Sequence, residues 1–249
     1  MKTKTITLSI LIAALLLSGC TALPFIGDRI VTPSDVIITE SRPVSDFTAI
    51  DFTTFGRVTI SQGDGESLTV SGPDNVVPLV QTTVRNGTLS IDMENDINIT
   101  TLNRDNGLNF TIELKDLNSL MVSGLGEITM DSLTTSDLVL EMSGAGSIKL
   151  DDLTADSLDI SVSGLGNVEV AGEVTTASIE ISGAGSVDAP DLKIETASVS
   201  VPGLGSATVW VTDQLTGDIS GAGSVNYYGD PQVQTNSSGL GSFKAMGSK

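Results

Sequence analysis

The feature that most constrains the fold is a Gly-x-Gly motif that recurs seven times after residue 120, at steps of 20, 20, 19, 20, 18 and 18 residues. The residue between the two glycines alternates strictly between leucine and alanine, and a serine precedes six of the seven motifs. Self-similarity at a fixed period of this length is typical of a repeat protein. The alternating residues are Leu125, Ala145, Leu165, Ala184, Leu204, Ala222 and Leu240.

Within each repeat, apolar and polar residues alternate with a period of two, which indicates β-strands with one buried face. The positions two, four and six residues before the first glycine hold Val162, Ile160 and Leu158 in one repeat, and they are apolar in the neighbouring repeats as well. A second apolar column follows four residues after the first glycine, as at Ile148 and Val168. Each repeat is therefore expected to be two short strands joined by a Gly-x-Gly corner at one side and by a turn rich in Asp, Thr and Ala at the other.

A repeat of about 20 residues with equivalent apolar columns and no helical pattern resembles one coil of a parallel β-helix. Coils stacked about 4.8 Å apart pair each strand with its equivalent above and below, so the apolar columns fill the interior. We predict an all-β fold: a single-stranded, right-handed parallel β-helix, or solenoid, whose N-terminal part contains a β-hairpin. The handedness follows from the usual sense of parallel strand connections. The alternative is an antiparallel solenoid or sandwich, which gives no reason for the identity of equivalent residues.

The sequence suggests a role for both residue types of the corner. A corner between strands favours residues with positive φ or a bulge, which glycine adopts without penalty. If the middle residue points inward, leucine stacked over alanine fills the interior better than seven leucines or seven alanines. The predicted structural corners are Gly124, Gly126, Gly144, Gly146, Gly164, Gly166, Gly183, Gly185, Gly203, Gly205, Gly221, Gly223, Gly239 and Gly241.

Residues 35–120 are less regular than residues 121–249, with which they are expected to be continuous. Strands are predicted at 56–60, 68–70 and 108–114, and the stretch 83–91 is a predicted hairpin around an Asn-Gly turn. We expect opening coils with a hairpin elaboration. This region could also cap the stack, because a bare end coil is an unpaired sheet edge.

The N-terminus has the pattern of a bacterial lipoprotein signal. Lys2 and Lys4 precede an apolar run that is too short to span a bilayer, and the run ends at Leu-Ser-Gly before Cys20, the only cysteine. Residues 1–19 are therefore predicted to be the signal peptide, and residues 20–34 a lipidated Cys20 with a tether to the membrane. Thr21 after the cysteine favours sorting to the outer membrane in a Gram-negative cell. Removal of residues 1–19 deletes two lysines and no acid, so the net charge changes from −19 to −21.

Composition excludes several classes of function. The chain has 12 basic and 31 acidic residues without a basic cluster, which argues against nucleic-acid binding. It has no histidine, which excludes Ser-His-Asp and Cys-His catalysis and any His-ligated metal. The single cysteine excludes an intramolecular disulfide.

Turn carboxylates are the one candidate for catalysis. Asp131 and Asp151 occupy equivalent positions on neighbouring coils beside Asp152, at a spacing that could serve a retaining glycosidase or a divalent cation. Turns also favour Asp for its local hydrogen bonds with the backbone, which is the simpler interpretation. From residue 121 on there are four basic and 17 acidic side chains, so this surface would repel an acidic polysaccharide.

Exposed aromatic residues are the candidate for binding. Strand alternation places Trp210 and Tyr228 on the outside, whereas the neighbouring Tyr227 falls in an interior column. Trp210 and Tyr228 are therefore the predicted contact patch for a protein or glycan partner.

The repeated Ser-Gly-Leu-Gly and Ser-Gly-Ala-Gly corners, preceded by the stretch 87–91 and followed by Tyr-Gly-Asp-Pro at 228–231, resemble the bacterial family described as putative auto-transporter adhesin, head GIN domain. The resemblance covers about residues 45–232 and implies a β-helical envelope or secreted protein with no established catalytic residues.

We therefore expect a non-enzymatic, lipid-anchored protein of the bacterial cell envelope, an adhesin or binding module on the outer membrane that faces the periplasm or the surface. Its expected partners are the membrane, through the lipid on Cys20, and a protein or glycan, with no catalytic residue, metal or cofactor. The alternative is a polysaccharide-active β-helix enzyme that uses the turn carboxylates.

Overall fold

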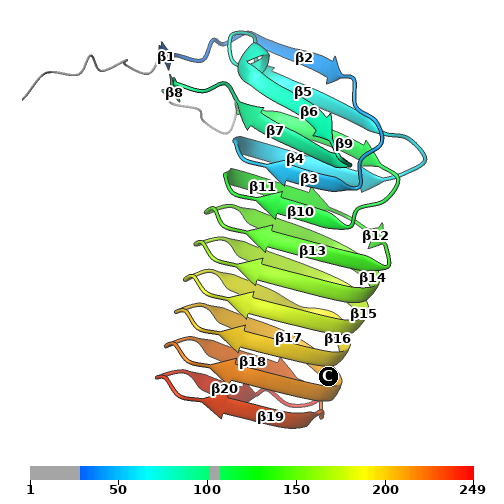
Figure 1. Ribbon diagram of the computed structural model, residues 1–249, viewed down its shortest axis with the longest axis vertical. Helices are drawn as coiled ribbons and strands as arrows, with labels where there is room; N and C mark the ends of the chain where they lie inside the picture. Colours follow the sequence, from blue (N-terminus) through cyan, green and yellow to red (C-terminus); the bar gives the residue numbers. More distant parts are fainter. Residues whose placement is uncertain (1–28, 101–106) are drawn as a thin grey trace, which may run out of the picture.

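The computed structural model describes residues 29–100 and 107–249. These residues form one long stack of coils, with an irregular cluster of strands at the N-terminal end (Figure 1). The described residues contain strands and one short 3-10 turn, η1 (Val77–Leu79). The prediction of an all-β solenoid with coils of about 20 residues is confirmed.

The regular repeat consists of coils whose strands pair in parallel with their equivalents. Leu140 pairs with Ile160, Ile160 with Ile179, and Ile179 with Val199. The apolar columns recognised in the sequence are therefore the columns of the stack. The strands are β10 (Ser119–Val122), β11 (Leu125–Met130), β12 (Leu133–Thr134), β13 (Asp137–Met142), β14 (Ser147–Val162), β15 (Asn167–Ile181), β16 (Ser186–Val201), β17 (Ser206–Ile219), β18 (Ser224–Tyr228), β19 (Gln232–Ser237) and β20 (Ser242–Ala245).

The core runs along the axis of the stack and is filled by these columns. Leu158, Ile160 and Val162 are buried, while the residues between them face solvent. Each coil therefore buries apolar area mainly against the coils above and below, which is the source of stability in a solenoid.

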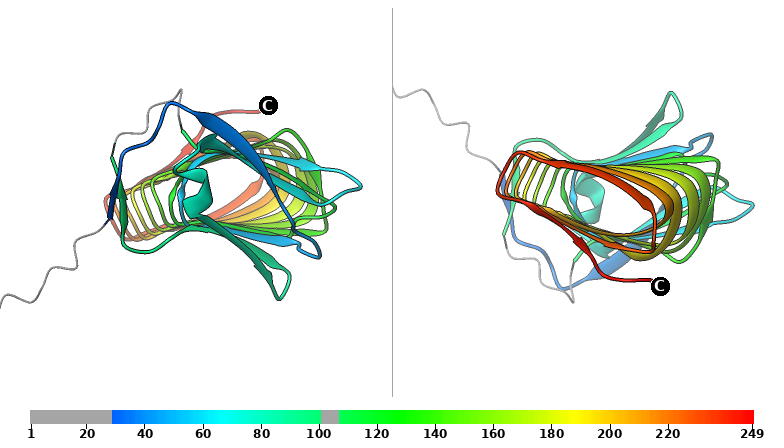
Figure 2. Two further views of the ribbon diagram at one scale, coloured as in Figure 1. Left: turned by 90° about the horizontal axis from the view of Figure 1, so that it is seen from above. Right: turned by 90° about the horizontal axis from the view of Figure 1, so that it is seen from below.

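The cross-section of the stack is flattened (Figure 2). The Gly-x-Gly motifs connect consecutive strands, such as β13 to β14 and β19 to β20, along one side of the stack (Figure 1). We call this side the narrow edge, and the opposite side, where long strands such as β17 bend, the broad edge.

The corner leucines point outward, so the predicted inward packing of leucine over alanine is wrong. Leu125, Leu165, Leu204 and Leu240 are 65%, 72%, 70% and 92% exposed. The buried columns lie at even offsets from the first glycine, whereas the middle residue lies one position after it. Strand alternation therefore continues through the corner and turns this residue to solvent.

The corner glycines are also required for a different reason from the predicted one. All fourteen lie in the described residues, and none has a φ in the left-handed region. A Cβ on Gly164 would lie 2.1 Å from the carbonyl oxygen of Gly144, and one on Gly203 would lie 2.2 Å from that of Gly183. Glycine is needed because successive corners approach each other too closely for any side chain.

The N-terminal region is folded out of sequence order. Its strands β3 and β4 pair in parallel with β10 and β11 on one side and with β7 and β9 on the other. The chain therefore forms β3 and β4, then adds residues 63–100 and 107–118 on the cap side of these strands, and then continues with β10 on their other side. The strands are β1 (Arg29–Val31), β2 (Ile37–Arg42), β3 (Ala49–Phe52), β4 (Phe55–Gln62), β5 (Ser67–Pro73), β6 (Val80–Arg85), β7 (Thr88–Met93), β8 (Ile97–Ile99) and β9 (Asn109–Leu114).

Antiparallel strands close the N-terminal end of the stack. β6 pairs with β7, β5 pairs with β9, and β2 pairs with β5 (Figure 1). In the predicted hairpin, Asn86 and Gly87 have φ values of 51° and 80°, as a tight turn with two positive φ angles requires. This region, which we call the cap, covers the sheet edge that an end coil would otherwise expose.

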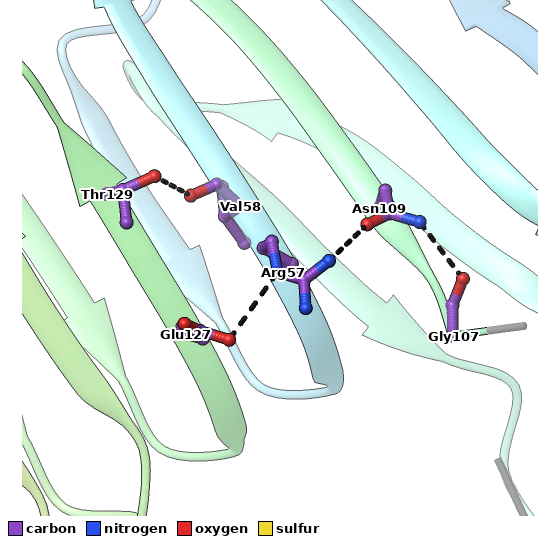
Figure 3. Close-up of polar contacts among 6 residues, drawn as sticks. All are labelled: Arg57, Val58, Gly107, Asn109, Glu127 and Thr129. Atoms are coloured by element: carbon purple, nitrogen blue, oxygen red, sulfur yellow. Dashed lines mark hydrogen bonds and ion pairs between the residues drawn. The ribbon is translucent and has the colours of Figure 1, made fainter. Parts of the chain in front are cut away.

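A row of polar contacts joins the cap to the repeat (Figure 3). Arg57 on β4 donates to Asn109 on β9 at 3.3 Å and to the carboxylate of Glu127 on β11 at 3.4 Å. The hydroxyl of Thr129 donates to the carbonyl oxygen of Val58 at 3.4 Å. These contacts cross three consecutive layers, so the cap and the repeat form one continuous stack.

The predicted signal peptide, residues 1–19, and Cys20 lie outside the described residues. The last part of the expected tether is described: β1 pairs in parallel with β8. No helix among the described residues is long and apolar enough to cross a membrane.

Candidate binding surfaces

The narrow edge carries a line of exposed apolar side chains, one for each coil. Backbone hydrogen bonds fix the spacing, since the amide of Leu165 donates to the carbonyl of Gly144 at 3.0 Å and the amide of Leu204 to that of Gly183 at 2.9 Å. We call this line the ridge. Its members are Leu125, Ala145, Leu165, Ala184, Leu204, Ala222 and Leu240, all exposed.

The ridge is free of charge in a chain whose formal net charge is −19. Six of the seven five-residue corner segments contain no Asp, Glu, Lys or Arg, and the first, 123–127, contains one charged residue, Glu127. The six are 143–147, 163–167, 182–186, 202–206, 220–224 and 238–242. Glu127 forms an ion pair with Arg57. Exposed serines such as Ser143 and Ser163 flank the leucines and alanines.

A pocket of about 540 Å³ lies at the cap end of the ridge. Phe55 stands one coil above Leu125, with which it is paired, and both line the pocket with Ile97 and Ile99 of β8. The ridge is therefore continuous with a largely apolar pocket that reaches β8, the strand on which β1 pairs, and Glu94 is the charged residue in its lining.

The two predicted aromatic residues lie side by side near the broad edge. Trp210 and Tyr228 are partners in the register of β17 and β18, and both are half-buried. The ammonium of Lys249 lies 5.4 Å from the centroid of the Trp210 ring and 5.6 Å from that of Tyr228, which is cation–π geometry. The same ammonium contacts the carboxylate of Asp191.

Further polar groups surround this pair of rings. Lys193 is the partner of Trp210 on the preceding strand, and its ammonium lies 2.6 Å from the carboxylate of Glu173. Hydrogen bonding to Glu173, and next its charge, raise the pKa of Lys193. We call Trp210 and Tyr228, with the charged groups of Lys193, Asp191 and Lys249, the aromatic patch. As alternation predicted, Tyr227 instead packs against the core.

A shallow groove of about 330 Å³ crosses the strand face that follows the broad edge. It is lined by hydroxyl and amide side chains from four successive coils, including Ser157, Thr176, Thr196 and Gln214. Gln214 follows Trp210 by four residues, so the groove opens close to the aromatic patch.

The turn carboxylates are associated with a lysine of the chain itself. Asp131 and Asp151 directly follow the paired residues Met130 and Leu150, as their equivalence predicted. The ammonium of Lys149 lies 2.5 Å from the carboxylate of Asp151. Hydrogen bonding to Asp151 is the main cause that raises the pKa of Lys149, and the charge of Asp131 adds to it. Among residues 29–100 and 107–249, no group of three or more acidic residues or cysteines has the geometry to hold a metal ion.

One carboxylate at the junction of cap and repeat titrates abnormally. Burial, and next the charge of Asp92, raise the pKa of Asp51 on β3 above its usual value of 3.8. Asp51 lines neither the pocket at β8 nor the groove at Gln214, so we relate this shift to stability.

Sequence reasoning placed the aromatic pair and the turn carboxylates where they lie, but it missed the ridge. The signal was present: the middle residue of each motif has the odd offset of the outward-facing serines, not the even offset of the buried columns. The pocket at β8 could not be found in this way, because it depends on the out-of-order packing of the cap.

These features define a capped parallel β-solenoid with an apolar narrow edge and an aromatic patch near its broad edge. The chain belongs to the family described as putative auto-transporter adhesin, head GIN domain, whose model matches residues 46–231. The family resemblance in the sequence is thereby confirmed.

Solved structures share this fold. A putative adhesin from Bacteroides fragilis NCTC 9343 is 28% identical, covers 87% of this chain and 100% of its own, and superposes with a TM-score of 0.83. A protein described as a putative lipid binding protein, from Parabacteroides distasonis ATCC 8503, is 23% identical over 88% of this chain and 100% of its own, with a TM-score of 0.74. A putative adhesin from Parabacteroides merdae ATCC 43184 is 20% identical, covers 88% of this chain and 99% of its own, and superposes with a TM-score of 0.68. No curated protein matches the chain.

Proposed function

We propose that this protein is a lipid-anchored, non-enzymatic binding module of the bacterial cell envelope, an adhesin whose aromatic patch binds a glycan. Membership of a family described as adhesins supports a role at the cell surface. The signal-like residues 1–19 before Cys20 support an anchor in the outer membrane.

The observation that carries the proposal is the pairing of Trp210 and Tyr228 on adjacent coils. The backbones of the two residues are about 4.8 Å apart along the stack, a spacing fixed by the hydrogen bonds of the sheet, so the two side chains project from adjacent coils. Binding to side chains that project from such a sheet needs little ordering of the protein, and preorganisation of this kind favours affinity.

The chemistry of the patch suits a carbohydrate. The apolar face of a sugar ring packs on an aromatic face, and its hydroxyls need polar partners at the rim. Lys193 and Asp191 offer charged donors and acceptors beside the rings, and the groove at Gln214 adds hydroxyl groups. The ammonium of Lys249 lies over both rings and has to move aside for a sugar to pack there. Because the repeat holds 17 acidic and four basic residues, a neutral glycan is favoured over an acidic one.

The ion pair formed by one of the turn carboxylates favours binding without hydrolysis. Asp151 pairs with the ammonium of Lys149, and this contact competes with use of the carboxylate as a nucleophile or base on a sugar.

A glycan array probed with the mature chain carrying Cys20→Ser tests the binding function. Neutral glycans should be retained, and Trp210→Ala with Tyr228→Ala should reduce retention at least about tenfold, the usual scale for loss of a binding hot spot. The matched control is Val233→Ala, which removes an exposed apolar side chain elsewhere on the last coils. Retention that survives the double substitution, or shortening of the retained glycans, would overturn the proposal.

The anchor is tested separately by the mass of the mature protein from bacterial membranes. A chain that begins at Cys20 with added acyl mass is expected, and Cys20→Ser should leave the precursor unprocessed and unacylated. An unmodified Cys20 in the membrane-bound mature protein would contradict the anchor and leave the glycan test unaffected.

A further inference from the structure

The ridge takes no part in the function proposed above, yet it is the most exposed apolar feature of the described chain. Its four leucines are between 65% and 92% exposed, whereas leucines of the apolar columns, such as Leu140 and Leu158, are buried. Large apolar side chains arranged in a continuous exposed row mark a surface that meets a partner. The fold itself needs only the glycines here, since the leucines fill no part of the core.

The shape and size of the ridge argue against a second copy as that partner. The corners that carry the ridge follow one another in a single row along the narrow edge (Figure 1). Four leucine and three alanine side chains offer on the order of 500 Å² of apolar surface. A stable dimer buries about 800 Å² on each partner, and its interface extends in two dimensions.

The charge pattern favours a lipid surface. Of the 17 acidic residues after residue 120, only Glu127 lies in a corner segment, and it is paired with Arg57. The rest of the ridge can therefore approach an apolar phase without desolvating a carboxylate. The exposed serines that precede three of the four leucines, Ser123, Ser163 and Ser238, can bond to water and headgroups in the interfacial zone. Segments that lie in this zone combine a narrow apolar face with polar flanks in the same way.

The course of the chain brings the ridge to the anchor. β1 begins at Arg29 and pairs with β8, which lines the pocket at the cap end of the ridge. Nine residue steps separate Cys20 from Arg29, and they can span at most about 30 Å. A lipid on Cys20 therefore holds the cap end of the narrow edge close to the bilayer.

We propose that the narrow edge lies on the bilayer that carries the anchor, with the leucines of the ridge inserted at the interface. The solenoid then lies along the membrane and presents its broad edge, with the aromatic patch, outward. This inference rests on the lipid anchor of the proposed function, but its geometry can be tested without cellular lipidation.

The test uses the single cysteine and the single tryptophan of the chain. The mature protein is coupled through Cys20 to a maleimide lipid in phosphatidylcholine vesicles, some of whose lipids carry bromine in the acyl chains. Bromine quenches tryptophan only where the indole enters the membrane. The wild type reports on the broad edge through Trp210, and the variant Leu165→Trp with Trp210→Phe reports on the ridge.

The indole introduced at position 165 should be quenched at least about fivefold more than Trp210, because only the ridge meets the acyl region. Adding Leu125→Ser, Leu204→Ser and Leu240→Ser to the ridge reporter should abolish the difference. Adding Ile37→Ser and Val233→Ser, which remove exposed apolar residues elsewhere, should preserve it. Circular dichroism checks that each variant keeps its strand content.

Equal and weak quenching at both positions would overturn the inference, since the solenoid would then stand away from the membrane. An indole at position 165 that is shielded from aqueous acrylamide but not quenched by bromine would also overturn it, in favour of contact between copies. Because coupling to Cys20 is chemical, a protein that is not acylated in cells would contradict the anchor without changing these results.

Discussion

The cap and the repeat use the same period-two alternation but convert it into structure in different ways. In the repeat, Ile160 pairs with Ile179 and Val199 follows in the same column, so each strand meets its own equivalent. In the cap, β3 meets β7 on one side and β10 on the other, and β5 runs antiparallel to β9. Alternation therefore specifies which face of a strand is buried, whereas only repetition specifies its neighbour.

The two regions also differ in the reason why glycine is required. Corner glycines of the repeat are fixed by the coil above them, at contacts that no side chain could fit. Gly87 of the cap is fixed by its own φ of 80°, in a turn with open space around it. Glycine is required in the repeat by contact between coils and at Gly87 by the local backbone angle. Substitutions at these positions are therefore expected to reduce stability by different amounts.

The largest effect is expected from Gly164→Ala in the repeat. Its Cβ would lie 2.1 Å from the carbonyl oxygen of Gly144, so two coils must separate. A loss of about 4 kcal/mol or more in the free energy of unfolding is expected. Gly65→Ala in the cap is the control. Its new Cβ meets a side-chain oxygen of Glu113 at 3.1 Å, which accepts a hydrogen bond from the Gly65 amide, and the substitution should cost about 1 kcal/mol. If both variants lost a similar free energy of unfolding in urea, the proposed difference between the repeat and the cap would be contradicted.

A second pair of substitutions tests the orientation of the corner. Leu158 is 1% exposed and Leu165, seven residues later, is 72% exposed. Leu158→Ala should cost about 2–5 kcal/mol and Leu165→Ala no more than about 0.5 kcal/mol. The comparison of their unfolding midpoints is decisive, since equal losses would mean that the corner leucines are packed inside after all.

A third substitution probes the cap alone. Gly87→Ala places a side chain at a φ of 80° and should cost about 1–2 kcal/mol. Amide exchange should quicken in β6 and β7 and stay slow in β14–β16, because the hairpin can open without the stack. Exchange that quickens throughout would show that the cap and the repeat unfold as one unit.

The smallest effect concerns Asp51, at the junction of the two regions. Its raised pKa means that the folded protein binds the proton more tightly than the unfolded chain does. Its contribution to stability therefore falls as the pH rises from 3.8 through the folded pKa, and a constant penalty remains at neutral pH. Asp51→Asn should raise stability at pH 7 by well under about 1 kcal/mol and flatten this part of the pH profile. A variant that is less stable than the wild type at pH 7 would contradict this.

The cap and the repeat also differ in how much of their structure the sequence predicts. In the cap, the strands at 56–60, 68–70 and 108–114 and the hairpin at 83–91 were predictable, and in the repeat the columns and the adjacency of Trp210 and Tyr228 were predictable. The addition of residues 63–100 and 107–118 on the cap side of β3 and β4 was not predictable, because no equivalent positions link those strands. The outward direction of Leu165 was predictable from its odd offset, whereas the argument from interior packing of leucine over alanine predicts the wrong direction.

The central claim is that successive coils stack in register with the corner leucines outside. Spin labels at pairs of cysteines test it directly: Leu125→Cys with Leu204→Cys, and Leu125→Cys with Leu240→Cys, each in a Cys20→Ser chain. Four and six coils separate these positions, so dipolar spectroscopy should give distances of about 19 Å and 29 Å, with the mobile line shapes of exposed labels. Distances that do not grow in this proportion, or labels immobilised as in a protein core, would contradict the account.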